Sequence, residues 1–387
     1  MKTIYYEPAG RVQNSEWELI NNPPEGYQFV LNNKTISDKI VHSSFMFDKV
    51  RDKMDTIMPL NLLKSGIDDL YKKVPKGVEL LYLYNHITSR KIPWVVNVEW
   101  AQVLVGREPA IFGKYKGAIE KALSSEWCKG IFAWDTLALQ SIRQAYDTSG
   151  FDNKLQVVFP AISAKDIDRT YTNDAPLNIL FVGSIDTPED FYAKGCRETL
   201  AAFRALTVEY PYITFTVRAN IPDKILNART RNPRVKFINH VLPKEELNEL
   251  FRIADIFVLP SHYAQEMVVL EAMSWGLPVV TSRVATMGEW IDNGETGFIL
   301  NQPKGFEYII NEFMLTSETT HRLDLVKRAK NYSVKDTADE LVVVLRKLIN
   351  DAGLRERIGT SAKLETTTGK LSINHRNKLL KGVFDKA

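Results

Sequence analysis

The chain has 387 residues, of which 44% are hydrophobic and 25% charged, with a formal net charge of +3 at pH 7. This composition is typical of a globular protein that is large enough for two domains, and it excludes disordered and collagen-like chains. The near-neutral charge gives no electrostatic indication of a dedicated nucleic-acid binder.

The two cysteines, Cys128 and Cys196, lie far apart in the sequence. They indicate neither a disulfide framework nor a zinc site, which suits a reducing cytosol. The first residues, MKTIYYEPAGRV, lack the apolar segment of a signal peptide. No apolar run approaches the roughly 20 residues that a membrane span requires. We therefore expect a cytoplasmic protein, for which peripheral contact with a membrane stays open.

The first half of the chain alternates β-rich runs with amphipathic segments. The predicted strands are Gln28–Leu31, Lys39–His42, Glu79–Leu83, Trp94–Val98, Gly130–Ala133 and Leu155–Phe159. Between them, Leu60–Lys73 and Gly113–Ser124 carry apolar residues at helical spacing. Strands separated by helices indicate a parallel sheet, so we expect residues 1–165 to form a Rossmann-like domain.

A polar segment, Ala164–Pro176, separates the two halves, and we assign residues 166–176 as the linker. The βα pattern then restarts, which predicts a second Rossmann-like domain over residues 177–360. Its predicted elements are Asn178–Val182, Gly195–Tyr210, Ile213–Arg218, Val235–Asn239, Lys244–Ala254, Ile256–Leu259, Met267–Trp275 and Leu277–Ser282. The chain ends in charged helical segments, and we expect residues 361–387 to pack back on the N-terminal domain. The predicted fold class is therefore α/β, with two Rossmann-like domains facing across a deep cleft.

In the second half, candidate ligand-binding residues follow the ends of two predicted strands. After the strand that ends at Val182, Gly183 lets a ligand approach the backbone, and Lys194 precedes a helix whose N-terminus attracts anions. Taken alone, a solvated lysine beside a helix cap is an equally good interpretation. Glu271 interrupts the apolar run MVVLEAM, and an acid in such a helix needs a partner, which ribose hydroxyls would supply.

These motifs also carry a family resemblance. In order, FVGS, KG, ADIFVLPS, LEAMSWGLPVV, GE and NGETGFIL resemble the C-terminal domain of GT-B glycosyltransferases of family 4, from about Asn178 to Leu300. The resemblance implies retaining transfer of a hexose from a nucleoside-diphosphate sugar, without a required metal or other cofactor. It implies that Glu271 holds the ribose, that Lys194 holds the diphosphate and that Gly183 belongs to the donor loop.

The chain departs from the family pattern at two positions. Tyr263 stands eight residues before Glu271, where the family usually has a glutamate, and Gln265–Glu266 replaces a turn that commonly contains glycine. Glu266 is five residues from Glu271, about 140° around a helix, so it is no simple substitute. Ser184 replaces the arginine that commonly follows Gly183.

Lys194 would then be the main cation on the leaving diphosphate. Arg218, at the end of the next strand, either helps it or is a surface residue. The amides around Met267 and Val268, at the start of the helix, complete the predicted donor site.

The first half offers polar residues where its predicted strands end: His42, Asn85, His86, Glu99 and Asp135. Carboxyl ends of parallel strands converge, so these are candidate acceptor contacts. Glu99 and His86 are the candidates for catalysis in this half, beside Lys194 and Glu271 in the other. Trp100 and Trp134 either stack on an acceptor sugar or belong to the core.

Two other enzyme classes are disfavoured. Asp166–Ile167–Asp168 fits the metal-binding Asp-x-Asp of a GT-A enzyme, but it lies in the linker, and a dehydrogenase would need a Gly-x-Gly-x-x-Gly that the chain lacks. A catalytically weak or inactive protein of the same fold that binds nucleotide sugars or glycans is the serious alternative, because of Tyr263 and Ser184. For the membrane, acids interspersed among Lys72–Lys73 and Lys114–Lys116 favour a solvated face.

Overall fold

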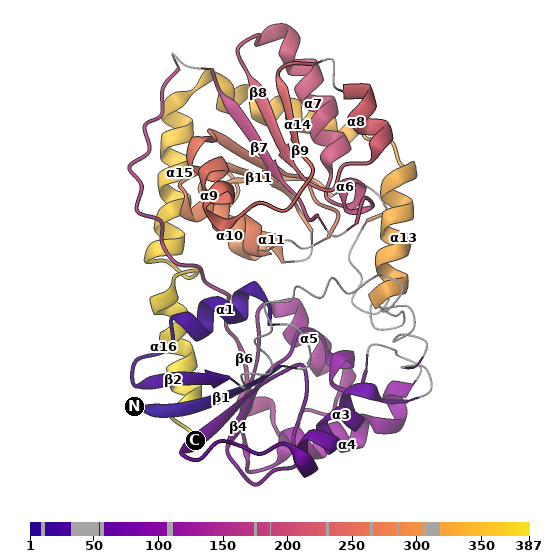
Figure 1. The fold of residues 1–387 in the computed structure, drawn as a ribbon, viewed down its shortest axis with the longest axis vertical. Coiled ribbons are helices and arrows are strands. Elements are labelled where there is room, and N and C mark those ends of the chain that lie inside the picture. Colours follow the sequence, from indigo (N-terminus) through magenta and orange to yellow (C-terminus); the bar gives the residue numbers. More distant parts are fainter. Residues whose placement is uncertain are drawn as a thin grey trace. The chain divides into compact units, whose positions relative to one another are not determined.

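The computed structural model describes residues 1–8, 12–31, 54, 58–106, 111–173, 176–185, 187–229, 232–263, 266–284, 286–302, 305–306 and 318–387. The predicted strand Lys39–His42 and the candidate Gln265 lie outside these residues. The chain forms two compact units (Figure 1). Met1–Ala161 and Ile373–Ala387 belong to the first, and Ile162–Tyr308 and Leu323–Ser372 to the second. The cleft expected between two domains stays a prediction.

The first unit is built on a six-stranded parallel sheet in the order β2-β1-β3-β4-β5-β6. Its strands are β1 (Lys2–Pro8), β2 (Tyr27–Leu31), β3 (Val78–Tyr84), β4 (Trp94–Asn97), β5 (Cys128–Ala133) and β6 (Leu155–Val157). Its helices are α1 (Asn14–Asn21), α3 (Leu60–Tyr71), η1 (Ala101–Leu104), α4 (Phe112–Ser124), α5 (Thr136–Ala145), η3 (Asp152–Lys154) and α16 (Ile373–Phe384). Strand order reverses between β1 and β3, which is where open α/β sheets bind ligands.

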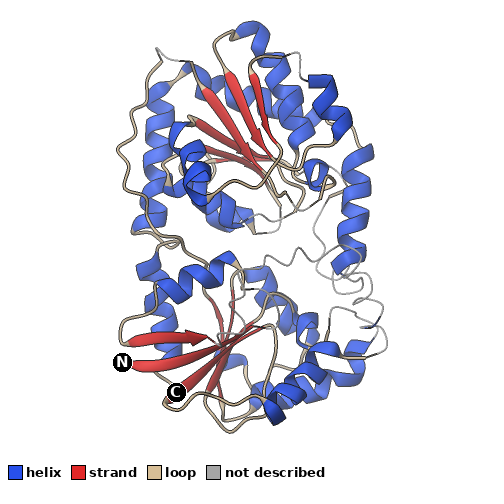
Figure 2. Ribbon diagram, in the orientation of Figure 1, coloured by secondary structure: helices blue, strands red, loops and turns tan. Residues whose placement is uncertain are grey.

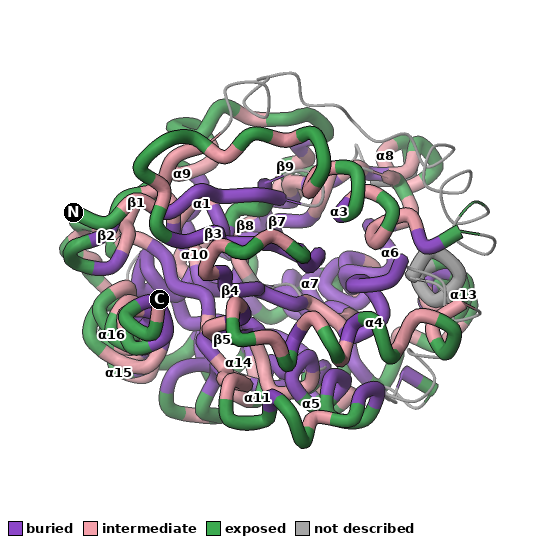
Figure 3. Tube along the Cα trace, turned by 90° about the horizontal axis from the view of Figure 1, so that it is seen from below, coloured by how far each residue is buried: buried purple, intermediate pink, exposed green. Residues whose placement is uncertain are grey.

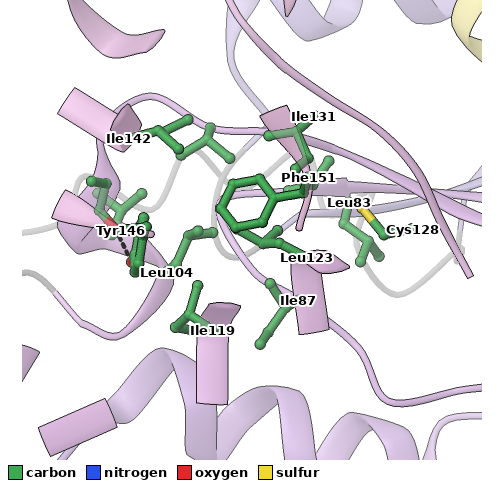
Figure 4. Packing of buried hydrophobic residues seen from close by; sticks show 14 of the residues in the cluster. Leu83, Ile87, Leu104, Ile119, Leu123, Cys128, Ile131, Ile142, Tyr146 and Phe151 are labelled. Carbon is green, nitrogen blue, oxygen red and sulfur yellow. Dashed lines mark hydrogen bonds between the residues drawn. The ribbon is translucent and has the colours of Figure 1, made fainter. Parts of the chain in front are cut away.

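Alternate residues of the first sheet fill two cores, because successive side chains of a strand point to opposite faces. Leu81 and Leu83 of β3 pack with Ile119, Leu123 and the other side chains shown in Figure 4. On the other face, Tyr82 packs among aromatic residues that include Phe384 of α16. A Cβ at Gly130 would lie only 2.2 Å from Val383 Cγ1, so glycine in β5 permits the close approach of α16.

The second unit contains another six-stranded parallel sheet, in the order β12-β11-β10-β7-β8-β9. Its strands are β7 (Asn178–Val182), β8 (Thr214–Arg218), β9 (Val235–Ile238), β10 (Ile256–Leu259), β11 (Val279–Ser282) and β12 (Phe298–Leu300). The central strands β7, β10 and β11 are buried, which explains why their sequences are continuous apolar runs rather than alternating ones. Figure 3 colours the whole chain by burial. Here the order reverses between β7 and β10.

Helices flank the second sheet on both faces (Figure 2). They are α6 (Asp190–Ala193), α7 (Cys196–Glu209), α8 (Asp223–Arg229), α9 (Lys244–Ile253), α10 (Glu266–Ser274), α11 (Met287–Trp290), α13 (Glu318–Asn331, of which Leu323 onward belongs here), α14 (Lys335–Asn350) and α15 (Ala352–Thr367). The boundary expected between residues 360 and 361 falls inside α15. This helix packs against α10, so the second unit continues to Ser372 and only α16 returns to the first.

Candidate functional site

The candidate site lies where the second sheet reverses its strand order. The neighbouring strands β7 and β10 end at Val182 and Leu259, and Gly183–Ser184 and Pro260–Tyr263 follow them. Because parallel strands end at the same edge, the loops that the sequence marked as a donor site start beside each other.

Gly183 and Arg218 hold each other through their backbones and one side chain. The Gly183 amide donates to the Arg218 carbonyl at 2.7 Å, and Arg218 Nη1 donates to the Gly183 carbonyl at 2.8 Å. The Asn220 amide donates to the carbonyl of Ser184 at 3.0 Å. The sequence left open whether Arg218 binds the diphosphate or is a surface residue. The structure shows a further role, because its guanidinium holds the loop after β7.

Lys194 directly follows the short helix α6, and its side chain is buried, with the residue 7% exposed. Gly195 has a φ of +76°, in the left-handed region where glycine carries no steric penalty. A Cβ there would lie 2.1 Å from the Pro260 carbonyl oxygen. Glycine at this position therefore lets the chain that carries Lys194 press against the loop after β10.

The close approach brings Lys194 to Tyr263. The Lys194 Nζ lies 5.8 Å from the centroid of the Tyr263 ring, within reach of a cation–π interaction. The Tyr263 hydroxyl donates to Asp190 Oδ1 at 3.2 Å, and Ser261 Oγ donates to the Tyr263 carbonyl at 2.6 Å. The two residues that the sequence singled out separately thus form one pair, and Asp190 had not been recognised.

Glu271 lies in the second turn of α10 and is half-buried. Its partners are within the chain: Lys165 Nζ lies 2.8 Å from Oε1, and Trp275 Nε1 donates to the same oxygen at 3.2 Å. Lys165 Nζ also lies 5.6 Å from the centroid of the Trp275 ring. Sequence reasoning looked for a ligand as the partner of this acid, and it missed Lys165 because that lysine was assigned to the end of the first domain.

The start of α10 places Met267 and Val268 half-buried in its first turn, so the backbone amides there are oriented as in any helix N-terminus. The helix begins at Glu266, one residue earlier than predicted.

Two further buried groups escaped the sequence reasoning. His262 Nε2 lies 3.0 Å from Glu198 Oε1, and both side chains are fully buried. His262 immediately precedes Tyr263, and Glu198 is four residues after Lys194. A histidine in a turn and a glutamate in a helix carry no joint signal in the sequence, because 64 positions separate them.

In the first unit, Glu99 follows β4 and is held by two neighbours at the end of β3. The Tyr84 hydroxyl donates to Oε1, and Asn85 Nδ2 donates to Oε2 at 2.8 Å. The Glu99 amide returns a bond to Asn85 Oδ1 at 2.9 Å, and Asn85 has a φ of 60°. Glu99 is half-buried, so part of its side chain is accessible to a ligand.

His86 is buried and lies beside Glu7. Its Nδ1 donates to the Tyr84 carbonyl at 3.0 Å, and its Nε2 lies 3.8 Å from Glu7 Oε2. Burial acts to raise the pKa of Glu7, but the neighbouring His86, the hydrogen bonds from Arg90 and the charges of Lys72 and Arg90 lower it to about 2. His86 thus lies beside a carboxylate that stays ionised. This contact is of a structural kind, although His86 was predicted to act in catalysis.

The remaining candidates of this unit have structural contacts. Asp135 is the N-cap of α5, where its Oδ1 accepts from the Ala138 amide at 2.7 Å. Trp134 is buried in the aromatic core against Phe132, and Trp100 packs partly against the opposite core. Within the described part of the chain, no group of three or more His, Cys, Asp or Glu side chains is arranged to hold a metal ion. In the same part, none of the helices has the length and apolar character to cross a membrane.

The chain resembles known proteins in its sequence and in its fold. Residues 176–314 match the family model of glycosyl transferases group 1. These residues are therefore similar to group 1 glycosyl transferases. The chain is also similar to the glycogen synthase of Mycobacterium tuberculosis (strain ATCC 25618 / H37Rv), with 36% identity over 128 residues, 32% of this chain and 30% of that protein. It is also similar to spore coat protein SA of Bacillus subtilis (strain 168), with 32% identity over 121 residues, 29% of this chain and 32% of that protein. The match thus spans about a third of the length of these relatives.

Solved structures share the whole fold. The Anabaena protein Alr3699/HepE, crystallised with UDP-glucose, covers 100% of both chains with a TM-score of 0.59 and 13% identity. WaaG, described as a glycosyltransferase involved in lipopolysaccharide biosynthesis, covers 99% of both chains with a TM-score of 0.55 and 16% identity. At such low identity these similarities concern the fold alone. The fold is GT-B.

Proposed function

We propose that this protein is a retaining glycosyltransferase of family 4, which moves a hexose from a nucleoside-diphosphate sugar to a hydroxyl group without a required metal. The acceptor is a glycan, a lipid-linked sugar or another hydroxyl compound. The observation that carries the proposal is the contact between Lys194 and Tyr263 at the point where the second sheet reverses. This point lies within residues 176–314, which match the family model.

The nucleoside-diphosphate sugar is bound by a charged group and by hydrogen bonds. The Lys194 ammonium holds the diphosphate, assisted by the amides at Met267 and Val268 in the first turn of α10. Glu271 accepts hydrogen bonds from the ribose hydroxyls. Tyr263 replaces a carboxylate with a neutral phenol, which positions Lys194 without neutralising its charge.

Transfer breaks the bond between the anomeric carbon and the diphosphate oxygen and forms one to the acceptor oxygen. Negative charge develops on the leaving diphosphate, where Lys194 stabilises it, and a single such contact contributes about 3 kcal/mol to lowering the barrier. The acceptor hydroxyl attacks on the face that the diphosphate leaves, and its proton passes to a diphosphate oxygen. No side chain needs to act as a nucleophile.

The acceptor binds the first unit at Glu99. This carboxylate is half-buried and is oriented by Tyr84 and Asn85, and Trp100 beside it offers a flat surface for a sugar ring. His86 supports this region through Tyr84 and Glu7, at the point where the first sheet reverses its strand order.

The proposal is tested first by measuring the melting temperature with UDP-, GDP- and ADP-sugars. A donor at about 100 times its Kd adds about 2.7 kcal/mol to the free energy of unfolding. Sugar transfer and spontaneous donor hydrolysis are then followed with the donor that binds, in the presence and absence of EDTA. Lys194→Ala is expected to lower kcat by about 100-fold or more.

Lys224→Ala is the matched control, because Lys224 is an exposed lysine of the same unit that lies over the Tyr192 ring. Its kcat is expected to equal that of the wild type. Binding of a donor without turnover on any acceptor would favour a nucleotide-sugar-binding protein instead. The absence of binding to every sugar nucleotide would overturn the proposal.

A further inference from the structure

A buried carboxylate–imidazole pair lies directly behind Lys194 and Tyr263. We propose that His262 and Glu198 are positioning residues, which fix the Lys194–Tyr263 pair at the distance that a diphosphate requires. The inference rests on the proposed function. It assigns a role to two residues that contact no substrate.

The pair is closed on all sides by the chain itself. His262 Nε2–H donates to Glu198 Oε1 at 3.0 Å, and the Tyr332 hydroxyl donates to the same carboxylate oxygen. The imidazole stacks on Phe306, with ring centroids 4.3 Å apart, and meets the Tyr332 ring edge-on at 5.2 Å. Both ionisable side chains are 0% exposed, so neither contacts solvent or a substrate.

Burying a carboxylate costs free energy unless hydrogen bonds replace its water. Here Oε1 receives two hydrogen bonds, from His262 of the loop after β10 and from Tyr332, the residue after α13, while Oε2 has no partner among the described residues. Arg197 adds bonds to the Ala329 and Lys330 carbonyls at 3.3 and 2.5 Å. Glu198 is therefore the point at which two separate stretches of chain, the loop after β10 and the end of α13, are attached to α7.

The attachment reaches Lys194 and Tyr263 through the backbone. The His262 amide donates to the Ala193 carbonyl at 2.8 Å, one residue before Lys194. Tyr263 is the next residue after His262, and Glu198 lies in the first turn of α7, the helix that follows Gly195. We therefore expect a displacement of the His262 side chain to move both members of the pair.

The inference predicts that variants of His262 and Glu198 lose the part of the binding affinity that comes from the second phosphate of a nucleoside diphosphate. The uridine, guanosine and adenosine mono- and diphosphates are used as probes, and the base that binds is carried forward. For the wild type we expect the diphosphate to bind at least about tenfold more tightly than the monophosphate, because a bond to a charged group is the stronger kind. The ratio of the two Kd values is the quantity compared among variants.

His262→Leu and Glu198→Gln are expected to bring this ratio to about threefold or less, with the Kd of the monophosphate nearly unchanged. His262→Gln, whose amide nitrogen can donate to Glu198 in place of Nε2, is expected to restore most of the ratio. Should His262→Leu fail to fold, Tyr332→Phe removes one hydroxyl only and is expected to lower the ratio by a smaller factor.

Arg355→Leu is the control for simple destabilisation, because Arg355 is buried in the same unit and donates to the Leu348 and Thr172 carbonyls. It should lower the melting temperature and leave the ratio unchanged. An unchanged ratio in folded His262→Leu and Glu198→Gln, or an equal loss for both nucleotides, would overturn the inference. If the wild type binds none of the nucleotides, or if Lys194→Ala leaves the ratio unchanged, the proposed function fails instead.

Discussion

Lys165 and Glu271 form an ion pair, with Nζ 2.8 Å from Oε1, that joins the segment entering the second unit to α10. Trp275 Nε1 donates to the same oxygen at 3.2 Å. Both of these contacts are made by Oε1. Under the proposed function, they orient the carboxylate and Oε2 accepts a hydrogen bond from the ribose.

The first prediction follows from this division of the carboxylate. Wild type should bind a nucleoside diphosphate more tightly than its 2′-deoxy counterpart, by about five- to tenfold for one lost hydrogen bond. Glu271→Ala and Lys165→Ala should both reduce this preference, and Lys165→Arg should keep it, with Kd measured by calorimetry. The control is Lys363→Ala, because Lys363 bonds the Ile167 carbonyl of the same segment without contacting Glu271. Tighter binding by Lys165→Ala would instead show that Lys165 competes with the ligand.

The second prediction concerns the glycine between Lys194 and α7. Gly195→Ala combines a left-handed backbone with a Cβ placed 2.1 Å from the Pro260 oxygen, so it should destabilise the protein by about 3 kcal/mol or more. Gly294→Ala has a similar φ of +83° but nothing within 4 Å of the added carbon, and it should cost only about 1 kcal/mol. Urea denaturation of both variants measures the difference. Equal costs would contradict the close approach of the two loops.

The third prediction uses the buried acid Glu16 in α1. Burial raises its pKa to about 7, with a contribution from the charge of Glu99, although hydrogen bonds from Asn97 and Tyr82 act against the shift. The folded protein then binds more protons than the unfolded chain between about pH 4.5 and pH 7, so stability falls as pH rises through this range and is constant above it. The shift corresponds to about 3 kcal/mol.

Glu16→Gln removes the ionisation and keeps the shape of the side chain. Its free energy of unfolding, compared with that of the wild type across pH 4 to about 8, should lose the decline assigned to Glu16. A difference between the two proteins that is independent of pH would show that Glu16 titrates normally. Glu7, whose pKa is lowered to about 2, loses its contribution only below about pH 4.5, so it does not interfere.

The fourth prediction tests membrane contact. On α3, Leu63, Ile67, Leu70 and Tyr71 recur on one side of the helix and are exposed, the last two by 78% and 80%. Lysines follow the helix directly, so we expect weak, salt-sensitive binding to vesicles that contain anionic lipid. Co-sedimentation should fall in a Leu70→Ser/Tyr71→Ser variant. Wild-type protein that stays in the supernatant with anionic vesicles would exclude this contact and leave α3 as a solvated surface.

Much of the second unit follows from local sequence. The predicted strands Asn178–Val182 and Ile256–Leu259 have the same bounds as β7 and β10, because strands buried on both faces give unbroken apolar runs between turn residues. The helix around Glu271 was predicted to within one residue at each end. In the first unit, β1 and α1 were missed, since Lys2–Pro8 mixes charged and aromatic residues and α1 has no side chain that caps its start.

The sequence by itself determined the two βα series, the likeness to glycosyltransferases and the candidate residues Gly183, Lys194 and Glu271. These depend on local periodicity and on residue types at fixed spacing. Only the tertiary structure decided which side chains meet: Lys194 with Tyr263, Glu271 with Lys165, and His262 with Glu198. The physical reason is that a buried charge takes its partner from whatever element the fold brings beside it, and the order of strands in a parallel sheet, rather than distance along the chain, sets which elements those are.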